Sequence, residues 1–116
     1  MTTATKVLGR YGEDVACGFL ERAGFEILDR NWRCNIGELD IVARVGTTLV
    51  FVEVKTRTFG QSAFEAIDRN KLRRLRQLAG LWCEANNPHA LDIRIDAVSV
   101  MVRSGAVTIE HLESVF

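Results

Sequence analysis

Apolar residues recur with two different periods along this chain, and the changes of period divide it into seven elements. Helical spacing extends from about residue 6 to residue 23, where Gly24 predicts a helix end, and returns from about residue 68 to residue 86. Alternating or continuous β-branched runs predict strands over residues 25–34, 37–43, 51–57, 91–102 and 106–112. The order helix, three strands, helix, two strands predicts an α/β fold, an α+β sandwich with a mixed sheet.

One face of the first predicted helix carries large apolar side chains. On a helical wheel they form a stripe of Leu8, Tyr11, Val15, Phe19 and Ala23. Glu13 lies at the border of this stripe, whereas Asp14 and Glu21 lie on the outer face. Glu13 therefore either looks towards the edge of the sheet or is an ordinary boundary glutamate, and the pattern favours neither.

The second and third predicted strands form a hairpin around Gly46, which can adopt the positive φ of a tight turn. If Gly46-Thr47 is a two-residue turn, Asp40 faces Glu53 and Glu38 faces Lys55 across the hairpin. Because side chains alternate along a strand, all four then project from one face. A four-residue loop would keep that face, and a three-residue loop would not.

Charge on this face is confined to the end of the hairpin away from the turn, because Val42 and Phe51 continue the face as apolar residues. Two opposed carboxylates, about 5 Å apart at Cβ, repel each other unless a cation or a proton lies between them. A ladder of salt bridges on a solvated sheet face explains any single pair. The segregated set of four favours a metal site with a lysine beside it.

Length and composition fit one domain over residues 1–116. The chain has 47% hydrophobic residues, one Pro and no repeat, so we expect no linker. Its amino terminus lacks the apolar core of a signal peptide and no apolar run approaches a membrane span, which predicts a cytoplasmic protein without a membrane partner. Cys17, Cys34 and Cys83 are expected to be reduced packing residues. A zinc site of Cys83 and His89 would lack its other ligands.

Charge is unevenly distributed although the formal net charge is zero, a value that argues against a general nucleic-acid coat protein. Five of the eight residues from 69 to 76 are basic: Arg69, Lys71, Arg73, Arg74 and Arg76. The apolar stripe of this second helix is Leu72, Leu75, Ala79 and Trp82, so we expect the basic residues to point away from the core. Positive charge after a candidate N-cap, Asp68, opposes the helix dipole, and a bound phosphate would relieve this. A solvated helix face is the plain alternative.

Together these residues carry a resemblance to a known group of enzymes. The order of elements, with Asp40 on the second strand and Glu53-Val54-Lys55 on the third, resembles the restriction-endonuclease-like core of the PD-(D/E)xK nuclease superfamily, which includes Holliday-junction resolvases. More narrowly, the chain resembles the small bacterial YraN-like family, described as predicted endonucleases. The resemblance covers nearly the whole chain. Its segments are Gly12-Glu13, residues 37–40, residues 51–57, and Lys71 with Arg74-Leu75, and Leu39 stands where the superfamily's name has proline.

The resemblance implies a metal-dependent nuclease. Asp40 and Glu53 would bind Mg²⁺ or Mn²⁺, with Glu13 and the Val54 carbonyl as further ligands. Lys55 would orient water or neutralise charge on the phosphate. Glu38 would be an outer partner of the site or of Lys55, and Asp96 occupies an acidic position without an assigned role. The residues expected to contact nucleic acid are Lys71, Arg73, Arg74, Arg76 and Arg57.

The implied substrate is DNA that is branched, flapped or single-stranded. The implied assembly is a homodimer, because junction resolvases pair two sites on two strands. The alternative is a catalytically silent module that binds nucleic acid or serves assembly. The set of two acids and a lysine favours the nuclease, since paired carboxylates repel phosphate unless a metal is bound.

Overall fold

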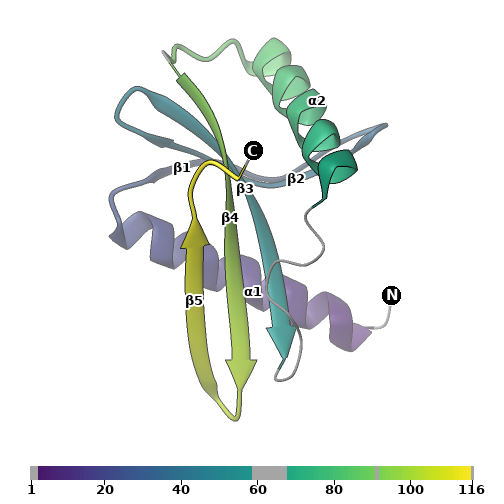
Figure 1. The fold of residues 1–116 in the computed structure, drawn as a ribbon, viewed down its shortest axis with the longest axis vertical. Coiled ribbons are helices and arrows are strands. Elements are labelled where there is room, and N and C mark those ends of the chain that lie inside the picture. The colour runs from purple at the N-terminus through teal and green to yellow at the C-terminus, as the bar shows by residue number, and fades with distance from the viewer. Residues whose placement is uncertain (1–2, 59–67, 91, 116) are drawn as a thin grey trace.

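The computed structural model describes residues 3–58, 68–90 and 92–115 and contains a five-stranded sheet with a helix on each side (Figure 1). The elements are α1 (Thr3–Arg22), β1 (Glu26–Cys34), β2 (Gly37–Val45), β3 (Thr48–Thr58), α2 (Arg69–Asn86), β4 (Asp92–Arg103) and β5 (Ala106–Leu112). The expected order is confirmed, although β3 begins three residues before the predicted strand. Leu91, the predicted first residue of β4, lies outside the described residues.

The sheet is mixed, as predicted, and is consistent with a restriction-endonuclease-like core. Its order is β1-β2-β3-β4-β5, and neighbours are antiparallel except β3 and β4, which run parallel. Parallel neighbours need a crossover connection, and α2 lies between these two strands in the chain. Figure 1 shows α1 crossing behind β3 and β4, with α2 beside β2 on the other side.

Each helix covers its own hydrophobic core. The core beneath α1 contains Ala16, Cys17 and Leu20 of the helix, packed against Ile41, Ala43, Val50, Val52, Val54, Val98 and Val100 of the sheet. The core beneath α2 contains Leu75, Leu78, Ala79 and Trp82, packed against Leu39, Val42, Leu49, Phe51 and Ile95. The predicted stripe of α2 is thus confirmed, with Leu72 at its border. β2 and β3 carry apolar residues to both cores, which explains their nearly continuous apolar runs.

The predicted stripe of α1 is confirmed at Val15 and Phe19, which pack against the core beneath the helix, but it is wrong at Tyr11 and Ala23. Tyr11 is 45% exposed and Ala23 is exposed, whereas Gly12, Ala16 and Leu20 are buried. The helix approaches the sheet through small residues, and a Cβ on Gly12 would lie 1.8 Å from Oγ1 of Thr56 on β3. A wheel weighted by large side chains misses such a contact.

Local signals at the helix ends are confirmed. Gly24 has φ of 94°, and the amides of Gly24 and Phe25 donate to the carbonyls of Glu21 and Leu20, a Schellman motif. Asp68 caps α2, because its side chain accepts from the amide of Lys71 at 2.9 Å. Among the described residues, neither helix combines the length and the apolar character needed to cross a membrane.

Candidate metal and phosphate site

The β2–β3 hairpin has the predicted two-residue turn. Five residue pairs follow the expected register, from Val45–Thr48 at the turn to Ile41–Val52. Within the described residues the ladder ends there, so the expected direct pairs Asp40–Glu53 and Glu38–Lys55 are not formed. Instead, Oδ2 of Asp40 accepts from the backbone amide of Val54 at 2.9 Å. A side-chain carboxylate therefore takes the place of a backbone acceptor where the two strands part.

The alternation of faces along β2 breaks at Asp40. Leu39 belongs to the core under α2 and Ile41 to the core under α1, although residues two apart on a regular strand share a face. On β1, in the register position opposite Asp40, Asn31 has a φ of 53° and is not among the paired residues. Such an irregularity re-aims side chains, as β-bulges do, and it turns Asp40 towards α1.

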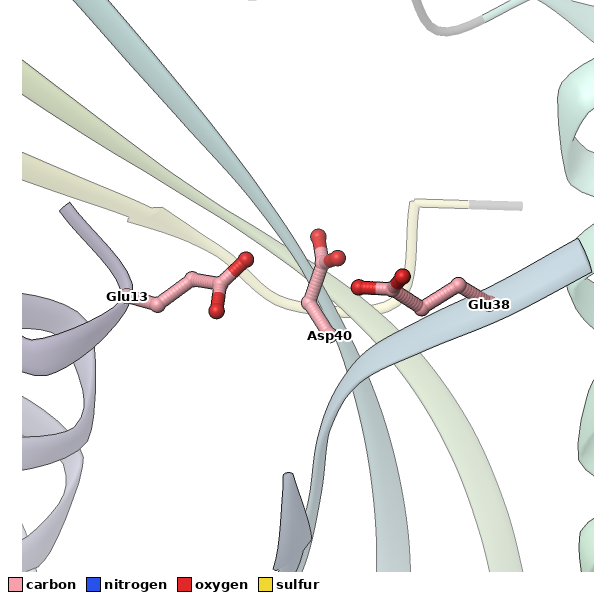
Figure 2. Close-up of side chains that lie close together, drawn as sticks. All are labelled: Glu13, Glu38 and Asp40. Atoms are coloured by element: carbon pink, nitrogen blue, oxygen red, sulfur yellow. The ribbon is translucent and has the colours of Figure 1, made fainter. Parts of the chain in front are cut away.

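Three carboxylates converge at this break (Figure 2). Glu13 reaches in from α1, and Glu38 and Asp40 come from β2; one oxygen of each lies within 4.8 Å of the others. Asn31 hydrogen-bonds to the side chain of Glu13, and Nε of Arg33 lies 2.6 Å from Glu38. Glu13 is thus part of the site rather than an ordinary boundary glutamate.

Two of these carboxylates, Asp40 and Glu13, hold protons more tightly than isolated acids do. Burial and the nearby charge of Glu53 raise the pKa of Asp40 from 3.8 to about 8, although the hydrogen bond from Val54 opposes the shift. Burial is also the main cause that raises the pKa of Glu13. Crowded acids with raised pKa values mark a place where a cation is energetically favoured.

Glu53 is not part of this convergent group among the described residues. It alternates with Val52 and Val54, which pack under α1, so its side chain leaves β3 towards α2. There its Oε1 lies 3.3 Å from Nζ of Lys71 and 4.0 Å from Nζ of Lys55. The direct cross-strand pair expected for Asp40 and Glu53 is therefore not formed. Both acids nevertheless line the same cleft, and the charge of Glu53 acts on Asp40.

The two lysines beside Glu53 differ in their affinity for a proton. Burial, together with the neighbouring ammonium group of Lys71, lowers the pKa of Lys55. Burial also acts to lower the pKa of Lys71, but its hydrogen bond to Lys55 and the charge of Glu53 outweigh burial and raise it. Lys71 is therefore the fixed positive charge of this pair.

Two clefts lie beside these acids and lysines. The main cleft has a volume of about 890 Å³ and contains the four acids together with Lys55. Four further cations line it: Lys6, Arg10, Arg33 and Arg57. The side cleft, about 340 Å³, lies at the amino terminus of α2 and is lined by Lys71 and Arg74 among others. Glu38 and Glu53 line both clefts.

Comparison with other proteins places the chain in a family. Residues 12–100 match the protein family described as "Uncharacterised protein family UPF0102", which is more than half of the chain. The chain belongs to UPF0102. A UPF0102 protein of Beutenbergia cavernae is 53% identical over 116 residues, covering 97% of this chain and 98% of the relative. UPF0102 proteins of Frankia casuarinae and Paenarthrobacter aurescens are 49% and 50% identical, covering 97% of this chain and 98% and 95% of the relatives.

The structure of this UPF0102 chain brings together most of the residues singled out from the sequence. Glu13, Asp40, Glu53 and Lys55 all line the main cleft, and Val54 contributes its amide to Asp40. Arg57 lines the same cleft, and Arg74 lines the side cleft. Arg73 and Arg76 are exposed on α2. Lys71 was expected to face outward, but it turns inward because Glu53 offers a partly buried negative charge.

Sequence reasoning missed several residues of the site. Arg33 could have been found, since the pairing rule applied to the Asn35-Ile36 turn sets it opposite Glu38, as observed. Lys6 and Arg10 carry no signal beyond helical spacing. Nothing in the local pattern indicates the positive φ of Asn31.

Asp96 has a structural position rather than a place in either cleft. It is fully buried and accepts from Arg94, from the amide of Ser114 and, with suitable protonation, from Nε2 of His111. These contacts tie β4 to the segment after β5. Asp96, to which no role was assigned from the sequence, thus anchors the carboxyl-terminal part of this chain.

Proposed function

We propose that this UPF0102 protein is a metal-dependent nuclease that hydrolyses phosphodiester bonds, with branched, flapped or single-stranded DNA as substrate. The observation that carries the proposal is the convergence of Glu13, Glu38 and Asp40 in a cleft that also contains five cations. Carboxylates alone repel a phosphate backbone, and a cationic rim alone needs no buried acids. Both features together fit a site that binds a phosphate through a divalent cation.

The donor set fits a hard cation. Three carboxylate oxygens within 4.8 Å of one another are the type of ligand that Mg²⁺ and Mn²⁺ prefer. Burial and the charge of Glu53 raise the pKa of Asp40, and a bound cation would favour its ionised form. Glu13, Glu38 and Asp40 would hold the ion, and Glu53 lies nearest as a further acid. When bound, the ion would supply Lewis-acid chemistry at the phosphate and make water more acidic.

The remaining residues act on the substrate and on water. Lys55 lines the main cleft and lies 4.0 Å from Glu53, where its amino group can orient a water molecule or neutralise charge that develops on the phosphorus oxygens. Lys6, Arg10 and Arg57 line the same cleft and would bind the phosphates on either side of the scissile bond. Arg33 holds Glu38 in position at 2.6 Å.

A cleavage assay tests the proposal. End-labelled four-way junctions, flaps, single strands, linear duplexes and RNA are incubated with the protein and Mg²⁺ or Mn²⁺. We expect at least one DNA to be cut, and we expect Asp40→Asn and Lys55→Ala to reduce the rate about 100-fold or more, while binding by Lys55→Ala changes little. The variants, purified in parallel, control for contaminating nucleases.

Binding without cleavage would decide for the alternative. If the protein binds these nucleic acids but cuts none of them with either metal, it is a binding or assembly module with a nuclease-like fold. If Asp40→Asn cuts as fast as the wild type, the observed activity does not come from this site.

A further inference from the structure

Lys71 lies in the first turn of α2, where a positive charge is unfavourable for the helix. The cap fixes this turn, because Asp68 accepts the amide of Lys71 at 2.9 Å and its own carbonyl accepts the amide of Leu72. A cation three residues after an N-cap opposes the helix dipole. The side chain of Lys71 is 31% exposed and its ammonium group points to Glu53 at 3.3 Å. The carboxylate of Glu53 on β3 therefore compensates for the unfavourable position of Lys71 in the helix.

Glu53 in turn depends on a nearby cation. Its side chain is only 12% exposed, and an ionised carboxylate at that depth is costly unless it is paired. The closest charge is Lys71 at 3.3 Å, since Lys55 is at 4.0 Å and has a lowered pKa. Glu13, Glu38 and Asp40 meanwhile converge on one another without Glu53. The fourth acid of the cleft is thus paired with a lysine and lies outside the group of three.

We propose that Lys71 is a built-in counter-ion of Glu53, a positioning residue that holds this carboxylate beside α2 until a divalent cation displaces the ammonium group. This inference rests on the proposed function, because it concerns the same site. An ammonium group and a divalent cation on one carboxylate repel each other, so the two compete for Glu53. Lys71 also lines the side cleft beside Arg74, which gives the displaced ammonium group an open place next to a second cation.

The competition predicts that removing the charge of Lys71 strengthens metal binding. Titration calorimetry on the wild type and on Lys71→Met would measure the affinity for Mn²⁺. Lys71→Met keeps the aliphatic part of the side chain but loses the charge. We expect Lys71→Met to bind Mn²⁺ about tenfold more tightly, which corresponds to about 1.4 kcal/mol. Lys71→Gln, with a shorter polar side chain, should show the same direction of change and provides a second variant if Lys71→Met folds poorly.

Two controls separate local competition from a general loss of positive charge. Arg69→Met removes one charge from an exposed position in the same first turn of the helix, and we expect less than about a twofold change in Mn²⁺ affinity, because solvent and salt screen that position. In a Glu53→Gln background, Lys71→Met should give no gain, because the carboxylate for which the two cations compete is gone. A merely structural role of Lys71 would not depend on Glu53 in this way.

Each other outcome overturns a specific statement. If the wild type and Lys71→Met bind Mn²⁺ equally, the counter-ion role is wrong and the metal site stands. Weaker binding by Lys71→Met would also overturn the counter-ion role, since it would show that Lys71 supports the metal. If neither the wild type nor any variant binds Mn²⁺, both the inference and the proposed function fail.

Discussion

The main cleft is an unfavourable environment for the ionised carboxylate of Asp40. It accepts one hydrogen bond from the amide of Val54, and it lies among three other acids, Glu13, Glu38 and Glu53, that line the same cleft. Burial and the charge of Glu53 raise the pKa of Asp40 to about 8. The folded protein without metal therefore binds a proton at Asp40 more tightly than the unfolded chain does.

This shift predicts a stability that decreases as the pH rises. Because the pKa of Asp40 is raised on folding, its contribution to stability is fully present below 3.8 and is lost as the pH passes through about 8. In metal-free protein we expect Asp40→Asn to raise Tm by about 4 °C at about pH 8.5. At about pH 4 we expect the same substitution to change Tm much less. Thermal unfolding followed by circular dichroism measures both.

Asp92→Asn is the matched control, because Asp92 is exposed at the start of β4. Its Tm should follow that of the wild type at every pH. Adding Mg²⁺ should raise the Tm of the wild type at high pH and leave that of Asp40→Asn nearly unchanged. Equal dependence on pH in Asp40→Asn and the wild type would show that Asp40 does not carry this protonation.

Asp96 predicts a different kind of effect, on stability alone. It is fully buried and receives hydrogen bonds from both ends of the guanidinium group of Arg94 and from the amide of Ser114. We expect Asp96→Asn to lower the free energy of unfolding in urea by about 2–4 kcal/mol, because Arg94 loses its buried carboxylate partner and keeps only the exposed Glu113 at 3.7 Å. Mn²⁺ affinity, measured well below the urea midpoint, should not change. A loss of metal affinity with unchanged stability would instead connect Asp96 to the site.

At the scale of elements, the position of α1 determines where Glu13 lies. Gly12 lets the helix backbone approach β3 so closely that a Cβ would lie 1.8 Å from Oγ1 of Thr56. The next residue is Glu13, which this contact carries towards Asp40. A glycine that is unfavourable for helix formation is therefore used to bring an acid to the sheet.

The close approach predicts that Gly12→Ala destabilises the protein although alanine favours helices. We expect a loss of about 1–3 kcal/mol, typical of an overpacked contact, and weaker Mn²⁺ binding because Glu13 moves outward. Gly9→Ala on the same helix is the control, since its Cβ would meet no atom within 4 Å among the described residues, apart from its chain neighbours and the adjoining helix backbone. It should be neutral or stabilise by up to about 1 kcal/mol. Similar stabilisation by both substitutions would mean that the helix does not depend on this contact.

Most of the elements, but only part of the site, could be predicted from the sequence. The helix ends depend on local signals such as Gly24 and Asp68, and the register of the hairpin depends on its turn, so both are readable in short segments. The prediction fails where the ladder ends, because the break in the alternation of β2 at Asp40 lies beside an irregularity at Asn31 on a neighbouring strand, which the hairpin turn does not determine. The inward turn of Lys71 is likewise set by a partner in a distant segment, Glu53, rather than by the helix pattern.

At the scale of the whole molecule, charge is sorted although it sums to zero. The acids Glu13, Asp40 and Glu53 lie within the main cleft, and cations from α1, β1 and β3 line it. Arg73 and Arg74 extend the positive surface onto α2, where the side cleft continues from the main cleft through Glu38 and Glu53. The homodimer expected from the resemblance stays a prediction, which sedimentation at high protein concentration can check.

This arrangement predicts that α2 binds nucleic acid through phosphates and separately from the acid cluster. We expect Arg73→Gln together with Arg74→Gln to weaken DNA binding by a similar factor for different sequences, and to reduce the slope of log K against log salt by about 0.9 for each lost phosphate contact on duplex DNA. Arg22→Gln with Arg103→Gln removes the same charge from exposed positions at the end of α1 and the end of β4. Fluorescence anisotropy over a range of salt concentrations should show a reduced slope only for the α2 pair. If both pairs reduce the slope equally, DNA binding depends on the overall charge of the protein, and α2 is not the binding surface.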